Sequence, residues 1–356
     1  MAKAGKKVSD QISEAAQVAD VIGTPIQFSQ KCKRIIEAII SDLNVCDMKW
    51  NLFVTAVQNI DNYKRMLPYL PGFVKNHTHL MTLINDVPYM YELYSRLLKQ
   101  TRSCQKFSIL LVHWVLFELN LPTFQSLSGE DINELLTKLP QNQASDKPTH
   151  IFKVNYDETS EEEKLFKART GYYPTKHTFF GCATDNLFEI LSGGFKEYRD
   201  SGNNGIPFNS ECTRVKNDTP RTPCCDNNST MGESFKAVAL CEFIERKEYI
   251  HSRSQDKDSY IHIHIPDMIR IRYVFFYCEN VKEIVEELDP IEENVIDKFW
   301  KSSYFLPVTG CAIAVSVLAF IYREDIKKVL YSISDVQMKN VKALVSRVCT
   351  PSDSHF

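Results

Sequence analysis

The chain has 356 residues, and because a domain usually holds about 100 to 200 residues, this length predicts two folded units with attached segments. Its 42 basic and 45 acidic residues give a net charge of -3, so no overall positive field favours nucleic acid, and we expect no nucleic-acid partner. The eleven cysteines lack any C-x-x-C spacing, which is more typical of reduced cysteines than of a disulfide framework.

The first half of the chain has the pattern of a helical domain. Residues 1–25 are polar and predict a flexible arm without the apolar core of a secretory signal. From 26 to 140 the apolar residues recur three or four positions apart, as Trp50, Phe53 and Val57 do. We therefore predict an all-helical domain over 26–140.

After the polar linker QNQASDKP the pattern changes from helices to strands. The runs HIFKVNY, KAVALCEFIE, YIHIHI and MIRIRYVFFYC are short, β-branched or aromatic, and partly alternating, which is typical of β-strands. A predicted helix lies between the first two of these runs. The fold class predicted for the body is therefore α+β, with a mixed domain over 149–290 following the helical one.

Two groups of residues could suggest a metal site. In YIHIHI the period of two places Tyr260, His262 and His264 on one face, but no third ligand accompanies the two histidines. Cys224 and Cys225 are adjacent, yet no second pair completes a tetrahedral set. We therefore predict no metal site, and we interpret YIHIHI as an edge strand with a solvated face.

A third pattern lies near the end of the chain, where the 21 residues from Ser302 to Tyr322 carry no charge. As a helix with a rise of about 1.5 Å per residue they would measure roughly 31 Å, close to the hydrocarbon thickness of a bilayer. We therefore predict one transmembrane helix at 302–322 and a C-terminal tail at 323–356. Because no signal sequence precedes it, we expect the body to face the cytosol.

The stretch TFFGCATDNLFEILSGGF predicts a strand that turns directly into a helix. Thr184 or Asp185 can cap the start of this helix, and Gly193 or Gly194 can end it in a left-handed conformation. Gly181, at the end of the strand, has no side chain and would let a ligand approach the main chain closely. Such a geometry suits an amide held by a backbone N–H and C=O pair.

Taken in order, these segments resemble the ADP-ribosyltransferase fold of the poly(ADP-ribose) polymerase family. DLNVCDMKWNLFVTAVQNIDNYKRMLPYLP and HLMTLINDVPYMYELYSRLLKQ resemble the helical domain of its tail-anchored mono-ADP-ribosyltransferase branch, and FFGCATDNLFEILSGGF, AVALCEFIE and YIHIHIPDMIRIRYVFFY resemble its catalytic strands. The resemblance implies NAD as substrate and transfer of ADP-ribose to protein side chains. It also implies partners at the endoplasmic reticulum membrane or nuclear envelope.

The resemblance also assigns residues to the NAD site. The family's glycine that binds the nicotinamide carboxamide corresponds to Gly181, and its third triad member, a tyrosine in this branch, corresponds to Tyr260. The stretch GNNGIPFNSE, with Gly205, corresponds to the segment that carries the stacking tyrosine. Tyr260 is thus the catalytic candidate, whereas without the resemblance it would be a strand packing residue.

Three positions depart from the family pattern. Phe180 stands where the family has its histidine, Cys182 where it has a serine, and Pro207 where it has the stacking tyrosine. A phenylalanine neither donates nor accepts a hydrogen bond, so the adenine-side ribose would lose a partner. The family's next element is a helix, but Pro220 and Pro223 oppose a regular helix in this region.

His177 could replace the missing histidine only if the strand contained a bulge. It lies three residues before Phe180, and an odd offset places it on the opposite face of a regular strand. Two functions therefore stay open. The protein is a tail-anchored mono-ADP-ribosyltransferase, or it is a catalytically impaired relative that acts as a membrane-held interaction or sensor module.

Overall fold

The computed structural model describes residues 24–99, 105–139, 147–197, 205–226, 228–252 and 260–282. These residues belong to one compact unit that ends at Pro290. The predicted transmembrane helix at 302–322, the tail at 323–356 and most of the N-terminal arm lie outside them. Within the described ranges, no helix has both the length and the apolar character needed to cross a bilayer.

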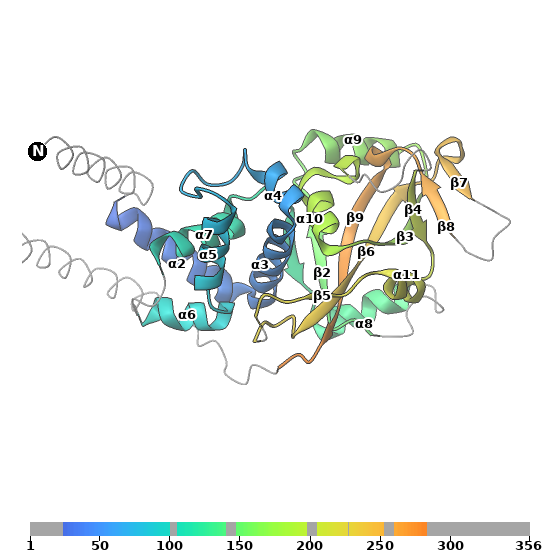
Figure 1. The fold of residues 1–356 in the computed structure, drawn as a ribbon. Coiled ribbons are helices and arrows are strands. Elements are labelled where there is room, and N and C mark those ends of the chain that lie inside the picture. Colours follow the sequence, from blue (N-terminus) through green and yellow to red (C-terminus); the bar gives the residue numbers. More distant parts are fainter. Residues whose placement is uncertain are drawn as a thin grey trace, which may run out of the picture. The chain divides into compact units, whose positions relative to one another are not determined.

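Among the described residues, the part of the predicted helical region before β1 contains six helices (Figure 1). They are α2 (Pro25–Ser41), α3 (Leu43–Gln58), α4 (Ile60–Met66), α5 (His77–Asp86), α6 (Met90–Leu98) and α7 (Lys106–Phe117). Thr24 and Gln27 form a capping box at the start of α2, which explains why the helix begins there. The core of this region is aromatic, with the ring of Phe53 on α3 lying 5.8 Å from those of Trp50 and Trp114.

The rest of the described chain forms an antiparallel sheet with helices on both faces. Among the described residues, nine strands pair in the order β1-β2-β9-β6-β3-β4-β8-β7, with β5 attached to β6. They are β1 (Thr123–Ser126), β2 (His150–Asn155), β3 (Thr175–Gly181), β4 (Ile206–Asn209), β5 (Thr222–Pro223), β6 (Ser234–Ile244), β7 (Ile250–Ser252), β8 (Tyr260–Ile263) and β9 (Ile269–Glu279). The α+β class predicted for the body is confirmed.

Four α-helices accompany the sheet: α8 (Gly129–Lys138), α9 (Glu161–Thr170), α10 (Thr184–Gly193) and α11 (Cys212–Asp218). The α11 face of the sheet carries Phe179, which packs in one cluster with Ile132 of α8 and Val215 of α11. The opposite face, here called the α10 face, carries Phe180, which contacts Phe195 just after α10. The alternation of β3 thus directs neighbouring phenylalanines into two separate cores.

Two elements lie where the sequence pattern did not place them. The sheet begins with β1, which pairs with β2 although it precedes the polar linker that we took as the end of the helical domain. The prediction that YIHIHI is an edge strand was wrong, because β8 pairs with β4 on one side and with β7 on the other. β1 and β7 are only four and three residues long, so neither has enough alternation to be recognised in the sequence.

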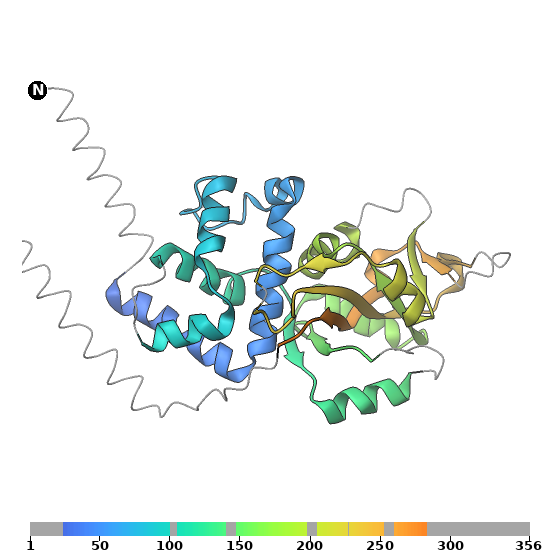
Figure 2. The same cartoon turned by 60° about the horizontal axis from the view of Figure 1, so that its bottom comes forward.

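Helix α3 lies alongside the sheet in both views and packs against α10 (Figures 1 and 2). Its Asp47 is buried, and one carboxylate oxygen, Oδ2, accepts hydrogen bonds from Ser229 Oγ at 2.7 Å, Thr230 N at 2.5 Å and Thr230 Oγ1 at 3.0 Å. Asn51, one turn later, donates to Ser229 Oγ and accepts from the backbone N–H of Cys225. These bonds join α3 to the segment between β5 and β6.

The Asp47 contact supports a prediction about stability. Asp47→Ala leaves the Ser229 and Thr230 donors buried without an acceptor, and we expect it to lower the free energy of unfolding by about 2 to 4 kcal/mol. Asp47→Asn keeps one oxygen as an acceptor and should cost clearly less. Urea denaturation followed by tryptophan fluorescence measures both. The exposed Asp61→Ala is the control, and equal losses for Asp47→Ala and Asp61→Ala would contradict the prediction.

Candidate functional site

Strand β3 leads directly to the predicted NAD site. It pairs with β6 in an unbroken register from Thr175 to Gly181. No bulge therefore brings His177 onto the face of Phe180, and His177 lies exposed in register with Glu242. The structure thus offers no replacement on this strand for the missing histidine.

Phe180 is a core residue of the α10 face. It is 1% exposed, and its ring centroid lies 5.2 Å from that of Phe195 and 5.5 Å from that of Phe208. Phe195 and Phe208 also contact each other, at 5.6 Å. The residue at the family's histidine position therefore belongs to a three-ring aromatic cluster.

The side of Gly181 where a side chain would stand is packed against α11. A Cβ atom at this position would lie 2.7 Å from Val215 Cγ1 and would collide with Thr219 Oγ1. Both contact atoms belong to the C-terminal part of α11 and the residue that caps it. The absence of a side chain, which we predicted to admit a ligand, instead admits this helix.

Helix α11 itself corrects the sequence analysis. Pro220 and Pro223 were expected to prevent a regular helix, yet α11 covers Cys212–Asp218 and ends before either proline. Thr219 closes it with a backbone hydrogen bond to Val215 O at 2.9 Å. A proline shortly after a helix terminates it without disturbing the preceding turns, which explains the difference.

The helix after Gly181 forms as predicted except at its start. Its N-cap is Ala183, which makes no side-chain cap bond, although Asp185 Oδ1, within the first turn, accepts the backbone N–H of Asn186 at 2.9 Å. Thr184 Oγ1 instead lies 2.7 Å from Thr222 Oγ1, and Asp185 Oδ2 accepts from Asn59 at 2.7 Å. At the other end Gly194 is the C-cap with φ 81°, the left-handed conformation that favours glycine.

Tyr260 lies on the α11 face and is held by α11. Its hydroxyl donates to Asp218 Oδ2 at 2.7 Å, and the guanidinium of Arg214 lies 5.4 Å from its ring centroid. Partial burial, followed by the hydrogen bond and charge of Asp218, raises the pKa of the Tyr260 hydroxyl. The structure therefore brings Tyr260 and Gly181 together under one helix, with β4 between their strands.

The remaining predicted site residues lie around β4. Pro207 is in register with His262 of β8 and is half-buried. Gly205 has φ 79°, and a Cβ there would lie 3.1 Å from the ring of His264. Cys182 is half-buried at the turn after β3. Of these positions, Pro207 lies on the α11 face, because it is two residues from Asn209, which pairs with Tyr260.

Asn209 is a buried polar residue that the sequence analysis missed. It is fully buried between Phe179 and Tyr260, its Oδ1 accepts from the backbone N–H of Glu211 at 2.8 Å, and its Nδ2 has no partner among the residues that the structure describes. In the sequence, only its place two residues after Pro207 could have indicated it. Within the described part of the chain, no three His, Cys, Asp or Glu side chains are grouped to hold a metal.

The aromatic cluster predicts the effect of restoring the family's histidine. Phe180→His removes apolar contacts with Phe195 and Phe208 and buries an imidazole, so we expect a loss of about 2 to 4 kcal/mol in unfolding free energy. His177→Ala, at an exposed position of the same strand, should change stability by less than about 0.5 kcal/mol. Thermal and urea unfolding measure both, and an unchanged stability for Phe180→His would contradict the core assignment.

The packing of Gly181 can be tested with a double-mutant cycle. Gly181→Ala should destabilise the fold by about 1 to 3 kcal/mol because its methyl group overlaps Thr219. In a Thr219→Ala background the same change should cost less, since the overlapping atom is gone. Gly72→Ala is the control, because nothing lies within 4 Å of an added Cβ there. Strictly additive effects of the two substitutions would show that Thr219 does not fill this space.

Comparison with known proteins identifies a relationship for the helical region. Residues 37–116 match the family model described as the ARTD15 N-terminal domain. No curated protein matches the chain. The matched range begins within α2 and ends at the last turn of α7, so it coincides with the helical core described above. The match supports a relationship of this chain to the PARP/ARTD proteins, and its helical region is similar to the N-terminal domain of an ADP-ribosyltransferase of that group.

Proposed function

We propose that this protein is an ADP-ribosyltransferase-like protein whose NAD site is impaired, and that it acts as a membrane-anchored interaction module. The observation that carries the proposal is the contact of α11 with Gly181. A Cβ atom at Gly181 would collide with Val215 and Thr219, and we infer that these side chains leave too little room for a nicotinamide at this strand end. The proposal is that NAD binding is lost at this site, and it is compatible with the relationship to the PARP/ARTD proteins.

Two departures from the family pattern, Phe180 and Pro207, each lower the binding free energy for NAD. Phe180 offers no hydrogen bond to a ribose hydroxyl, and leaving such a group unpaired in a dry pocket costs about 1 to 3 kcal/mol. Pro207 has no aromatic face to stack on a nicotinamide ring, a loss of about 1 kcal/mol. Since each 1.4 kcal/mol is a factor of about ten in affinity, these two changes together, about 2 to 4 kcal/mol, weaken NAD binding by roughly thirty-fold to several hundred-fold.

A weaker hold on the nicotinamide also lowers the rate of transfer. The reaction requires the ring to be fixed while its glycosidic bond loosens, and only contacts that persist in the transition state accelerate this step. Tyr260 and Gly181 stay on one face of the sheet, which is the observation in favour of the working transferase as the alternative function. Yet the Tyr260 hydroxyl is already bonded to Asp218 of the helix that covers this face.

The membrane part of the proposal rests on the sequence. The uncharged run at 302–322 is long enough to span a bilayer, and it would tether the folded body to the cytosolic side. The resemblance to the tail-anchored branch suggests the endoplasmic reticulum or nuclear envelope as the location. The partners would then be other proteins at this membrane.

The experiment is a titration of the full-length chain in detergent with NAD, by calorimetry, together with transfer of labelled ADP-ribose. We expect no binding at up to about 1 mM NAD and no labelled protein. Binding tighter than this, together with label transfer, would overturn the proposal in favour of the transferase.

A second set of variants asks whether the filled space at Gly181 is the cause. The combination Phe180→His and Pro207→Tyr restores the family residues but leaves α11 in position. We therefore expect this double variant to show neither NAD binding nor transfer of ADP-ribose. Adding Val215→Ser shortens the side chain over Gly181, and recovery of NAD binding only in this triple variant would identify the helix as the obstacle. Recovery in the double variant would show instead that α11 does not exclude the nucleotide.

A further inference from the structure

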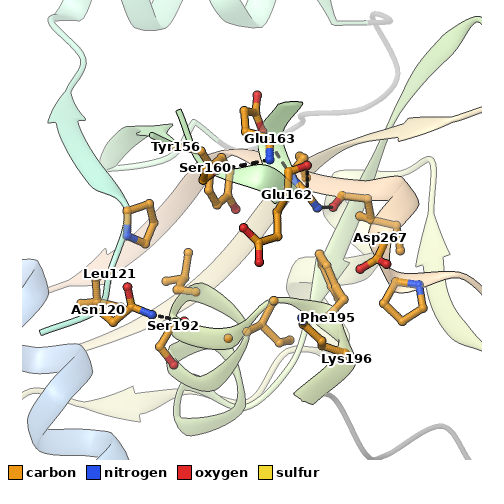
Figure 3. A pocket seen from close by; sticks show the side chains of 18 of the residues that line it. Asn120, Leu121, Tyr156, Ser160, Glu162, Glu163, Ser192, Phe195, Lys196 and Asp267 are labelled. Atoms are coloured by element: carbon orange, nitrogen blue, oxygen red, sulfur yellow. Dashed lines mark hydrogen bonds and ion pairs between the residues drawn. The ribbon is translucent and has the colours of Figure 1, made fainter. Parts of the chain in front are cut away.

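Helix α11, which packs over Gly181, has few buried contacts with the sheet. It has seven residues, and because isolated helices shorter than about 12 to 15 residues are marginal in water, it depends on those contacts. Of its seven residues, Cys212 and Val215 are the buried ones. Helix α10 on the opposite face is held better, since it has ten residues and buries five of them. The Asn120 amide also donates to Ser192 O near the end of α10 at 3.1 Å (Figure 3).

A buried amide donor without a partner lies at the start of α11. Asn209 shares the α11 face with its cross-strand neighbours Phe179 and Tyr260, and its exposed fraction is 0%. Its Oδ1 accepts the backbone N–H of Glu211, the N-cap of α11, whereas its Nδ2 has no acceptor within the described ranges. A donor held out of water without an acceptor is unfavourable, and water would reach Nδ2 once α11 moved away from β4. The closed position of α11 therefore has a cost that an open position would not have.

The other end of α11 is held by a lysine of β6. The Lys236 ammonium donates to Lys216 O at 2.9 Å and to the next carbonyl oxygen at 3.2 Å, and a cation is favourable at the C-terminal end of a helix. Desolvation, followed by the positive charges of Arg221 and Lys216, nevertheless lowers the pKa of Lys236. The carboxylates of Asp218 and Glu279 offset this only in part. Lys236 thus closes α11 against the sheet from an electrostatically unfavourable position.

We propose that α11 is a lid that opens locally from the sheet, that Lys236 keeps it closed, and that the unpartnered amide of Asn209 favours its opening. The lid packs over Gly181, so the fraction of molecules with an open lid sets how accessible this strand end is. A ligand that needs the open state binds more weakly in proportion to that fraction. The inference rests on the proposed function only for what the lid covers, because the opening itself needs no ligand.

Two buried cysteines of the chain can report the opening. Cys212 lies in the first turn of α11, its Sγ lies 3.2 Å from the hydroxyl of Tyr277, and burial raises the pKa of its thiol to about 11. Cys241 on β6 is equally buried, and it pairs with Thr178 on the α10 face. Alkylation requires an accessible thiolate, so neither cysteine reacts while it is buried. Opening of α11 exposes Cys212, whereas exposing Cys241 requires unfolding of the sheet.

The test treats the full-length protein in detergent with iodoacetamide at neutral pH and follows the labelling of each cysteine by mass spectrometry of its peptide. We expect Cys212 to be labelled at least tenfold faster than Cys241, because local opening is more frequent than unfolding of the sheet. Equal labelling rates would mean that α11 leaves the sheet only when the whole fold opens, and this result would overturn the proposal.

A lysine variant tests what keeps the lid closed. Lys236→Met retains the apolar stem and removes the ammonium, so we expect Cys212 to be labelled at least threefold faster while Cys241 is unchanged. The matched control is Lys176→Met, because the Lys176 ammonium lies on β3 and donates to Glu245 rather than to α11. This control should leave both rates unchanged. An equal rise at both cysteines, or the same rise in the control, would show that Lys236 does not act on a lid.

A second variant tests the unpartnered amide. Asn209→Leu replaces the side chain by an apolar one of similar shape, and the exposed N–H of Glu211 can then bond to water. We expect it to slow the labelling of Cys212 at least threefold, and unchanged or faster labelling would contradict the role of Asn209.

The labelling is measured without NAD, which separates this inference from the proposed function. Tight NAD binding by the wild-type protein would overturn the proposed function and leave the lid in place. Equal labelling of Cys212 and Cys241 would overturn the lid alone.

Discussion

The alternation of side chains along β3 is the constraint on which the rest of the site depends. It places Phe179 and Gly181 on the α11 face and Phe180 on the α10 face. Phe180 can therefore join the aromatic cluster with Phe195 only because its neighbours face the other way. Gly181, with no side chain, then leaves room for α11 to cover that strand end, and the covering helix in turn holds Tyr260 through Asp218.

The sequence and the structure agree where the information is local. The buried face of α10 and its left-handed end at Gly194 follow from apolar spacing and from glycine's tolerance of positive φ. They disagree where a short element or a distant partner decides. α11 was missed because Pro220 was taken to disfavour a helix rather than to end one, and β7 was missed because three residues carry no pattern. Asp47 could not be predicted, because its partners Ser229 and Thr230 lie far along the chain.

The resemblance named residues for the candidate site, but the packing around them could not be predicted from the sequence. The resemblance pointed to Gly181 and Tyr260, and the structure brings both under one helix. Whether a glycine at a strand end is open or filled depends on side chains some 35 residues later, here Val215 and Thr219. Such a contact between separate elements leaves no periodic signal.

The buried bonds of Asp47 have a consequence for the distant strand end. These bonds hold the segment between β5 and β6 against α3. This segment is joined through β5 to α11, the helix that packs over Gly181. Displacing α11 would therefore pull on this segment and on its bonds to α3. A protein that binds the helical region could in this way change the accessibility of Gly181 without touching the sheet, and thermodynamic linkage requires the reverse effect to be equally large.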